Sequence, residues 1–208
     1  MNPIALLSRL PASKSADFVC RRVTILERVM IFIDGNNFNA AKLGMNHGSV
    51  NYAKLAREIA GPDRLLLKTH YYSALSKRED NPEKHDRQQR FLSALSSLPR
   101  FEVVVGYLMK KAIPGVPYNP TDPNTWIHVE KETDVNIASD MLVKGYNNAF
   151  DTAVLVSADT DYLKVLKDLR RIGKIVEVAV TPTQQSQAVR ASADSVISLT
   201  EDFLARCE

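Results

Sequence analysis

Cysteine is scarce in this sequence: it occurs only twice, as Cys20 and Cys207, one near each end of the chain. Two cysteines so far apart provide neither a disulfide framework nor the paired spacing of a structural zinc site, and they suit a reducing compartment. We therefore expect a cytoplasmic protein. The 4 histidines are scattered without the spacing of metal ligands, so zinc chemistry is not expected.

Long apolar runs and a strong charge imbalance are also missing. No segment approaches the ~18 consecutive apolar residues that a membrane helix needs, so no membrane partner is expected. Lys and Arg number 27 against 24 for Asp and Glu, a net charge of +3. This balance gives no overall electrostatic reason to expect a nucleic-acid partner, so any such interaction must come from a local group of side chains.

The N-terminal stretch differs in composition from the rest of the chain. It carries several serines and more basic than acidic side chains, with Arg21 and Arg22 side by side. This composition weakly resembles an organelle transit peptide, and a start at Met30 is a further alternative. We expect a flexible extension over residues 1–27, followed by a single domain over residues 28–208, which is long enough to bury a substantial core.

Short apolar runs alternate with helical patterns along the remaining chain. Shorter patterns predict an edge strand at residues 195–199 and a brief extended segment at 126–129. The alternation of strands with helices predicts a parallel, doubly wound α/β sheet with right-handed crossovers. Five apolar runs predict strands, and those at 29–33 and 153–156 are typical of buried strands; the runs are residues 29–33, 64–72, 101–108, 153–156 and 174–180.

Acidic residues follow two of these predicted strands. Asp34 comes directly after residues 29–33, and Asp159 and Asp161 follow residues 153–156. In an open α/β sheet, ligands bind in the crevice at the carboxyl ends of the strands. The two later aspartates also suit the N-terminus of the next helix, but a helix cap needs only one carboxylate.

A further acidic segment, KETDVNIASDML, precedes the central strand. Its pattern predicts a helix with Thr133 as the N-cap and Asp134 in the first turn, aimed at the sheet. Asp140 lies about 120° further around the helix axis, which makes it the more distant candidate.

Four of these carboxylates, from Asp34, Asp134, Asp159 and Asp161, are expected to converge on one crevice. Like charges raise one another's pKa values, so such a cluster needs a cation to neutralise it. Oxygen ligands without His or Cys favour Mg²⁺ or Mn²⁺. These ions polarise phosphoryl oxygens and activate water, so the chemistry that the cluster predicts is phosphodiester hydrolysis.

Neighbouring side chains are candidates for supporting roles. We expect Asn37 and Ser157 to orient the ligands or a bound water by hydrogen bonds, and Lys131 to meet a substrate phosphate. Tyr71 and Tyr72 end their strand at the same edge of the sheet. The sequence leaves two alternatives open for these tyrosines: they stack on nucleobases, or they belong to the core.

Three segments in this order, FIDGNN, KETDVNIASDML and VLVSADTDYLKVLKDLRRIGKIVEV, resemble the NYN domain, the LabA-like branch of the PIN-like nuclease superfamily. The resemblance implies a PIN-like three-layer sandwich around a mainly parallel sheet of five to six strands. It also implies metal-dependent endoribonuclease activity on RNA. The positions that match the family's motifs are Asp34, Asn37, Asp134, Ser157, Asp159 and Asp161, with Asp140 at a further acidic position.

Two residues depart from the family pattern: Ala158 and Glu132 stand where the family usually has glycine. Ala158 disfavours a strongly positive φ, and Glu132 adds negative charge near the metal. The alternative function is a catalytically weak or inactive RNA-binding or regulatory module of the LabA-like type. A phosphatase lacks support because the chain has no recognisable phosphoaspartyl motif. A homodimer or a protein partner is left open.

Overall fold

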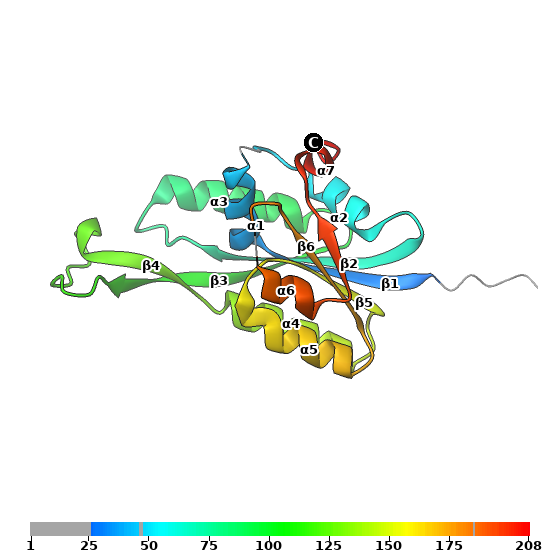
Figure 1. Ribbon diagram of the computed structural model, residues 1–208. Coiled ribbons are helices and arrows are strands. Elements are labelled where there is room, and N and C mark those ends of the chain that lie inside the picture. The colour runs from blue at the N-terminus through cyan, green and yellow to red at the C-terminus, as the bar shows by residue number, and fades with distance from the viewer. Residues whose placement is uncertain (1–25, 46–47, 185) are drawn as a thin grey trace, which may run out of the picture.

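A seven-stranded sheet forms the centre of the molecule (Figure 1). The computed structural model describes residues 26–45, 48–184 and 186–208, so most of the expected N-terminal extension lies outside the described residues. The strand order is β4-β3-β2-β1-β5-β6-β7, and only the β3–β4 pair is antiparallel. The strands are β1 (Glu27–Asp34), β2 (Arg64–Leu75), β3 (Phe101–Ala112), β4 (Trp126–Lys131), β5 (Thr152–Val156), β6 (Ile175–Val180) and β7 (Ser195–Ser198).

Helices cover both faces of this sheet, which confirms the expected three-layer α/β sandwich (Figure 1). One layer consists of α1 (Gly35–Gly44), α2 (Tyr52–Ala60), α3 (Pro82–Ser96) and α7 (Glu201–Ala205). The other consists of α4 (Thr133–Tyr146), α5 (Leu163–Arg171) and α6 (Gln187–Ser192). Two 3-10 turns, η1 (Pro123–Thr125) and η2 (Thr160–Tyr162), complete the described elements. No described helix has both the length and the hydrophobicity to cross a membrane.

The apolar strand runs arise because alternate residues enter opposite layers. In β1, Ile31 and Ile33 pack in the cluster that contains Phe38 of α1. Phe32 lies between them in the chain and packs in the other cluster, with Ile137 of α4. Both faces of the central strands are therefore buried by apolar side chains, so polar side chains lie at the carboxyl edge of the sheet.

The sheet has seven strands, where five to six were expected, because the segment at 126–129 is a full strand. β4 is antiparallel and pairs with the outer half of β3. The sequence also does not reveal α1, because the DGNN turn is at the same time a helix start. Asp34 is the N-cap of α1, and its side chain accepts a hydrogen bond from the Asn37 N–H.

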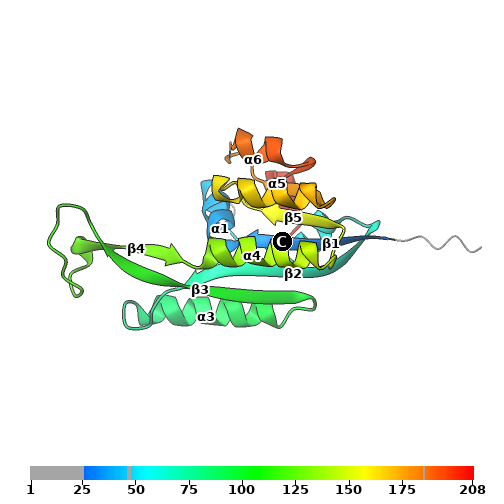
Figure 2. The same ribbon diagram turned by 90° about the horizontal axis from the view of Figure 1, so that it is seen from below.

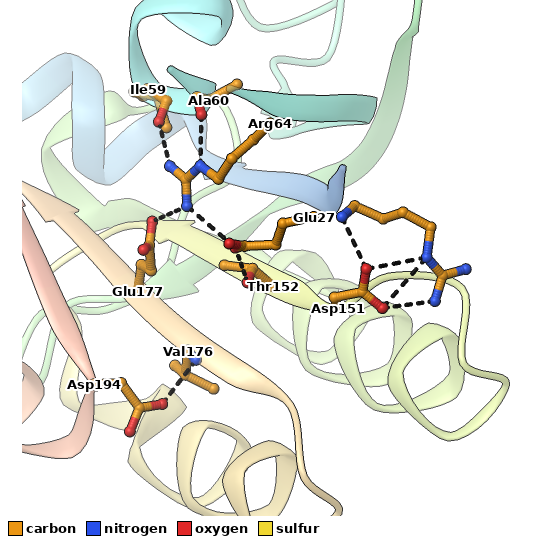
Figure 3. Close-up of polar contacts among 10 residues, drawn as sticks. Glu27, Ile59, Ala60, Arg64, Asp151, Thr152, Val176, Glu177 and Asp194 are labelled. Atoms are coloured by element: carbon orange, nitrogen blue, oxygen red, sulfur yellow. Dashed lines mark hydrogen bonds and ion pairs between the residues drawn. The ribbon is translucent and has the colours of Figure 1, made fainter. Parts of the chain in front are cut away.

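At the amino end of the sheet, Arg64 ties several elements together (Figure 3). Its Nη1 lies 3.0 Å from Glu177 of β6 and 3.5 Å from Glu27 of β1. Its Nε and Nη2 donate to the Ala60 and Ile59 carbonyls at the end of α2. This guanidinium thus satisfies carbonyls that a helix end leaves free.

Stability is expected to depend on pH through His70, which is 0% exposed and stacks on Phe32. Glu102 lies 3.6 Å from Nδ1, beyond hydrogen-bond range. Burial lowers the pKa of His70 from 6.5 to about 4. The folded state therefore resists protonation, and the stability that the neutral ring contributes is complete above pH 6.5 and is lost as the pH falls through 4.

We expect His70→Phe to remove this acid-dependent loss, which amounts to up to about 3 kcal/mol for the wild type. Urea unfolding at pH 7.5, 5.5 and 4 measures the difference. Parallel pH profiles of the two proteins would contradict the prediction.

Candidate active site

The carboxyl ends of β1 and β5 lie side by side, because Ile33 pairs with Val156 in the parallel ladder. Asp34 is the last residue of β1, and Ser157 directly follows β5. Asp34 is only 5% exposed. Its Oδ1 accepts a hydrogen bond from the Asn37 N–H at 3.1 Å, and its Oδ2 accepts one from the Ser157 hydroxyl at 3.1 Å.

Asp134 reaches the same place from the first turn of α4. Its Oδ1 accepts a hydrogen bond at 2.7 Å from the Tyr162 hydroxyl, which lies 3.3 Å from Asp34 Oδ2. One hydroxyl has one proton, so it donates chiefly to the nearer carboxylate. Tyr162 is 1% exposed, so the two carboxylates meet at one buried oxygen atom.

Asn37 and Ser157 connect the start of α1 with the loop after β5. Asn37 Oδ1 accepts hydrogen bonds from the Ala158 N–H at 3.1 Å and from Gln184 Nε2 at 2.5 Å. Ser157 Oγ accepts one from the Asp159 N–H at 3.1 Å. The start of α1 and the loop after β5 are therefore held in one geometry by two residues that also contact Asp34, Asn37 through its backbone N–H and Ser157 through its hydroxyl.

Asp159 and Asp161 differ in their surroundings. Asp159 is half-buried and is the N-cap of η2, where its Oδ1 accepts a hydrogen bond from the Asp161 N–H at 3.0 Å. The Asp161 side chain is exposed and takes no part in this cap. The capping interpretation thus accounts for one carboxylate, and the second faces solvent beside the site.

The remaining predicted residues lie around this centre. The Asp140 carboxylate accepts a hydrogen bond from the Tyr72 hydroxyl at 2.7 Å and pairs with Lys144 at 2.9 Å. Lys131 is exposed at the end of β4. Tyr71 and Tyr72 are both 0% exposed, so the alternative that placed them in the core is right and neither can stack on a base.

The electrostatics of the site centre on Asp34. The pKa of this carboxyl is raised to about 6, chiefly by burial and to a smaller extent by the nearby charges of Asp134 and Glu130. The hydrogen bonds from the Asn37 N–H and the Ser157 hydroxyl oppose that rise because they stabilise the charged form. The net result is a carboxylate whose charge is costly unless a cation or a proton neutralises it.

Two residues of this site, Tyr162 and Glu130, were not predicted from the sequence. Tyr162 directly follows the DTD segment, so its position was a usable signal. No sequence signal pointed to Glu130, because only the antiparallel pairing of β4 brings this residue to the site. One Glu130 carboxylate oxygen accepts a hydrogen bond from the Asn36 side-chain amide. The other, Oε1, is buried and has no hydrogen-bond partner among the described residues.

The donor set fits a hard divalent cation. Carboxylate and hydroxyl oxygens surround the point where Asp34 and Asp134 meet, and oxygen atoms are the ligands that Mg²⁺ and Mn²⁺ prefer. Buried Glu130 Oε1 adds an unpartnered acceptor. Within the described residues, no three His, Cys, Asp or Glu side chains already form a metal cage. The carboxylates would therefore have to close around a cation.

The junction of β4 and α4 explains one departure from the family pattern. Glu132 has φ 73°, in the left-handed region that glycine adopts at little cost. It also occupies the N-cap of α4 without a capping side chain, so the prediction of Thr133 as N-cap is wrong. Ala158 is not among the described residues with positive φ. A glycine would thus relieve strain at position 132 and has no such role at 158.

We expect Glu132→Gly to raise the free energy of unfolding by about 1 kcal/mol, because it removes the left-handed strain and loses part of that gain to chain entropy. Glu132→Ala is the matched control, since it removes the same charge but keeps a Cβ. Chemical unfolding measures both. Equal stabilisation by the two substitutions would attribute the effect to charge and contradict the backbone explanation.

The comparisons with known proteins agree with this fold. The model of the NYN domain family matches residues 28–200. The chain is similar to the crystal structure of a protein of unknown function from Vibrio parahaemolyticus, with a TM-score of 0.59 and 20% sequence identity over 86% of this chain and 96% of that chain. At this identity the likeness shows a shared fold. No curated protein matches the chain.

Proposed function

This chain belongs to the NYN domain family, and on that premise we propose that it hydrolyses RNA phosphodiester bonds at the site around Asp34, using Mg²⁺ or Mn²⁺. NYN domains belong to the PIN-like nuclease superfamily, which generally binds RNA and uses divalent metal ions. The observation that carries the proposal is the meeting of the Asp34 and Asp134 carboxylates at the Tyr162 hydroxyl.

Four aspartates would hold the cation and the reacting groups: Asp34, Asp134, Asp159 and Asp161. When bound, a divalent ion would supply charge stabilisation at the phosphate and a lowered pKa for water. Asp34 is the buried anchor, fixed by the Asn37 N–H and the Ser157 hydroxyl. Asp134 and Asp161 are exposed, so they face the solvent from which RNA and water arrive.

Tyr162 would act as a positioning residue. Burial and the two neighbouring carboxylates raise its pKa, so the phenol keeps its proton and remains a hydrogen-bond donor at neutral pH. The hydroxyl can therefore hold Asp134 in place without adding negative charge. Asp140 accepts a hydrogen bond from Tyr72 and forms an ion pair with Lys144, which supports a role in orienting α4.

Cleavage of a mixed pool of end-labelled RNAs, with Mn²⁺, Mg²⁺ or EDTA, tests the proposal. We expect cutting that requires the metal and is lost in Asp159→Asn, whose amide oxygen can still cap η2. The matched control is Asp63→Asn, an exposed aspartate just before β2 at the opposite edge of the sheet. Metal binding without RNA cleavage would overturn the proposed nuclease activity and favour the alternative of a regulatory module.

A further inference from the structure

A two-stranded ribbon projects from the sheet beside the active site (Figures 1 and 2). β2 pairs with β3 only as far as Tyr107, and β4 pairs with the part of β3 from Tyr107 to Ala112. The ribbon therefore extends past the end of β2. Its inner end carries Glu130 and leads directly into α4, whose first turn holds Asp134.

One face of this ribbon is open to solvent. Directly paired residues share a face, and the pairs are Tyr107 with Lys131, Met109 with Val129 and Lys111 with Ile127. These six residues form what we name the outer face. Tyr107 is 46% exposed, Met109 42% and Ile127 51%, and both lysines are exposed.

The alternate residues fix the ribbon in place. Lys110 lies 2.5 Å from Asp80, and His128 Nε2 lies 3.1 Å from the same carboxylate. The Lys110 ammonium also lies over the Trp126 ring, 4.3 Å from its centroid. The Asp80 side chain is 7% exposed, so this cluster anchors the ribbon to the loop before α3. The outer face is thus held open beside the site.

The charge on the outer face selects its partner. Lys111 and Lys131 carry its only charges, and neither has an ion-pair partner within residues 26–45, 48–184 and 186–208. A second copy docked symmetrically through this face would bring these lysines together without an acidic side chain to receive them. Phosphates would neutralise them, and an exposed tyrosine beside them offers a surface on which a base can stack.

Building on the proposed nuclease function, we propose that the outer face binds the single-stranded RNA segment next to the bond to be cut. Tyr107 stacks on a base, and Lys111 and Lys131 contact phosphates. Lys131 is the last residue of β4, and Asp134 lies three residues later in the first turn of α4, so the track ends beside the active site. The face is short, about 13 Å from Tyr107 to Lys111 at ~3.3 Å per residue, so the contacts concern nucleotides close to the scissile phosphate.

Fluorescence anisotropy with a labelled single-stranded RNA, in EDTA so that no metal-dependent cleavage occurs, tests this proposal on the full chain. We expect Tyr107→Ala to weaken binding about tenfold, the scale of one base stacked on an aromatic ring, and Tyr107→Phe to retain affinity. Tyr146→Ala, at a tyrosine 68% exposed on α4, is the matched control and should bind as wild type.

The lysines are tested by the salt dependence of the same binding. Lys111→Glu combined with Lys131→Glu should weaken binding and reduce the slope of log affinity against log salt by about 1.4, the value for two phosphate contacts on a single strand. Lys167→Glu, at an exposed lysine of α5, should change neither affinity nor slope beyond the effect of one distant charge.

The outcomes separate this proposal from the nuclease itself. Wild-type affinity in both Tyr107→Ala and the double lysine variant overturns the RNA track, even if the protein cleaves RNA. A dimer seen by light scattering and lost in Tyr107→Ala, with RNA affinity unchanged, makes the outer face a contact between copies and also overturns it. Loss of RNA binding in these variants by a protein that never cleaves supports the track and overturns only the nuclease.

Discussion

Asp34→Asn is expected to abolish RNA cleavage and at the same time to stabilise the metal-free protein. The loss of activity should be roughly 10²- to 10³-fold or more, the scale of removing one preorganised electrostatic group from a transition state. The gain in stability follows from burial, because Asp34 is 5% exposed and an amide has no charge to desolvate. The amide oxygen can still accept the Asn37 N–H, and the Ser157 and Tyr162 hydroxyls can rotate to accept from the amide nitrogen.

The pH dependence of this effect has a definite sign. The pKa of Asp34 rises from 3.8 to about 6 on folding, so the folded protein binds the proton more tightly than the unfolded chain. That stabilisation is complete below pH 3.8 and is lost as the pH rises through 6. Asp34→Asn should therefore be more stable than wild type by up to about 3 kcal/mol at pH 7 to 8, with the advantage gone below pH 4.

Thermal and urea unfolding in EDTA, from pH 4 to 8, measure this difference. The control is Asp134→Asn, an exposed carboxylate whose replacement should also stop cleavage but remove no buried charge. Adding Mn²⁺ should stabilise wild type and leave Asp34→Asn nearly unchanged. A variant of Asp34 that is less stable than wild type at pH 7 would show that this carboxylate serves the fold rather than a ligand.

Gly35→Ala is expected to destabilise the protein by roughly 2 to 4 kcal/mol, within the range of severe overpacking. A Cβ at this position would lie 2.5 Å from the Tyr71 ring and 2.6 Å from the Tyr72 carbonyl oxygen. Tyr71 is fully buried and its hydroxyl accepts a hydrogen bond from Asn39 in α1, so it has little room to move. The start of α1 would shift instead, and Asp34 with it.

The matched control is Gly48→Ala, because an added Cβ there meets nothing within 4 Å. Urea unfolding should show no comparable loss for this control. The same pair, compared by Mn²⁺ titration of the folded protein, should show weaker metal binding only for the variant at position 35. Equal stability of the two variants would mean that the start of α1 tolerates a shift and is not held as tightly as the contacts indicate.

The two strands that lead into the site, β1 and β5, were predictable from the sequence because two regularities of parallel sheets coincide at their carboxyl ends. A strand buried on both faces is continuously apolar, so the first polar residue marks its end, as Asp34 and Ser157 do. Parallel strands then place those ends at one edge. Neither regularity reveals α1, because a turn and a capped helix start use the same residues, Asp34 followed by glycine and asparagine.

Long-range pairing explains the rest of what the sequence could not show. Glu130 enters the site only because β4 folds back on β3 beyond a long loop, and no local pattern specifies that pairing. The burial of Tyr71 and Tyr72 likewise depends on α1 and α4, which cover the strand end. The strand predicted at 101–108 includes the exposed Tyr107 but stops short of Met109 to Ala112, the residues that extend β3 along β4.

The most direct test of the proposed hydrolysis is to measure the source of the oxygen atom that enters the cleaved phosphate. RNA cut by the wild-type protein with Mn²⁺ in ¹⁸O-labelled water is analysed by mass spectrometry. Attack by water predicts one ¹⁸O atom in the new terminal phosphate, with no such product in EDTA or from Asp159→Asn. An unlabelled 2′,3′-cyclic phosphate, which arises when the RNA's own 2′-hydroxyl attacks, or intact RNA after incubation with the folded protein, would contradict metal-dependent hydrolysis at this site.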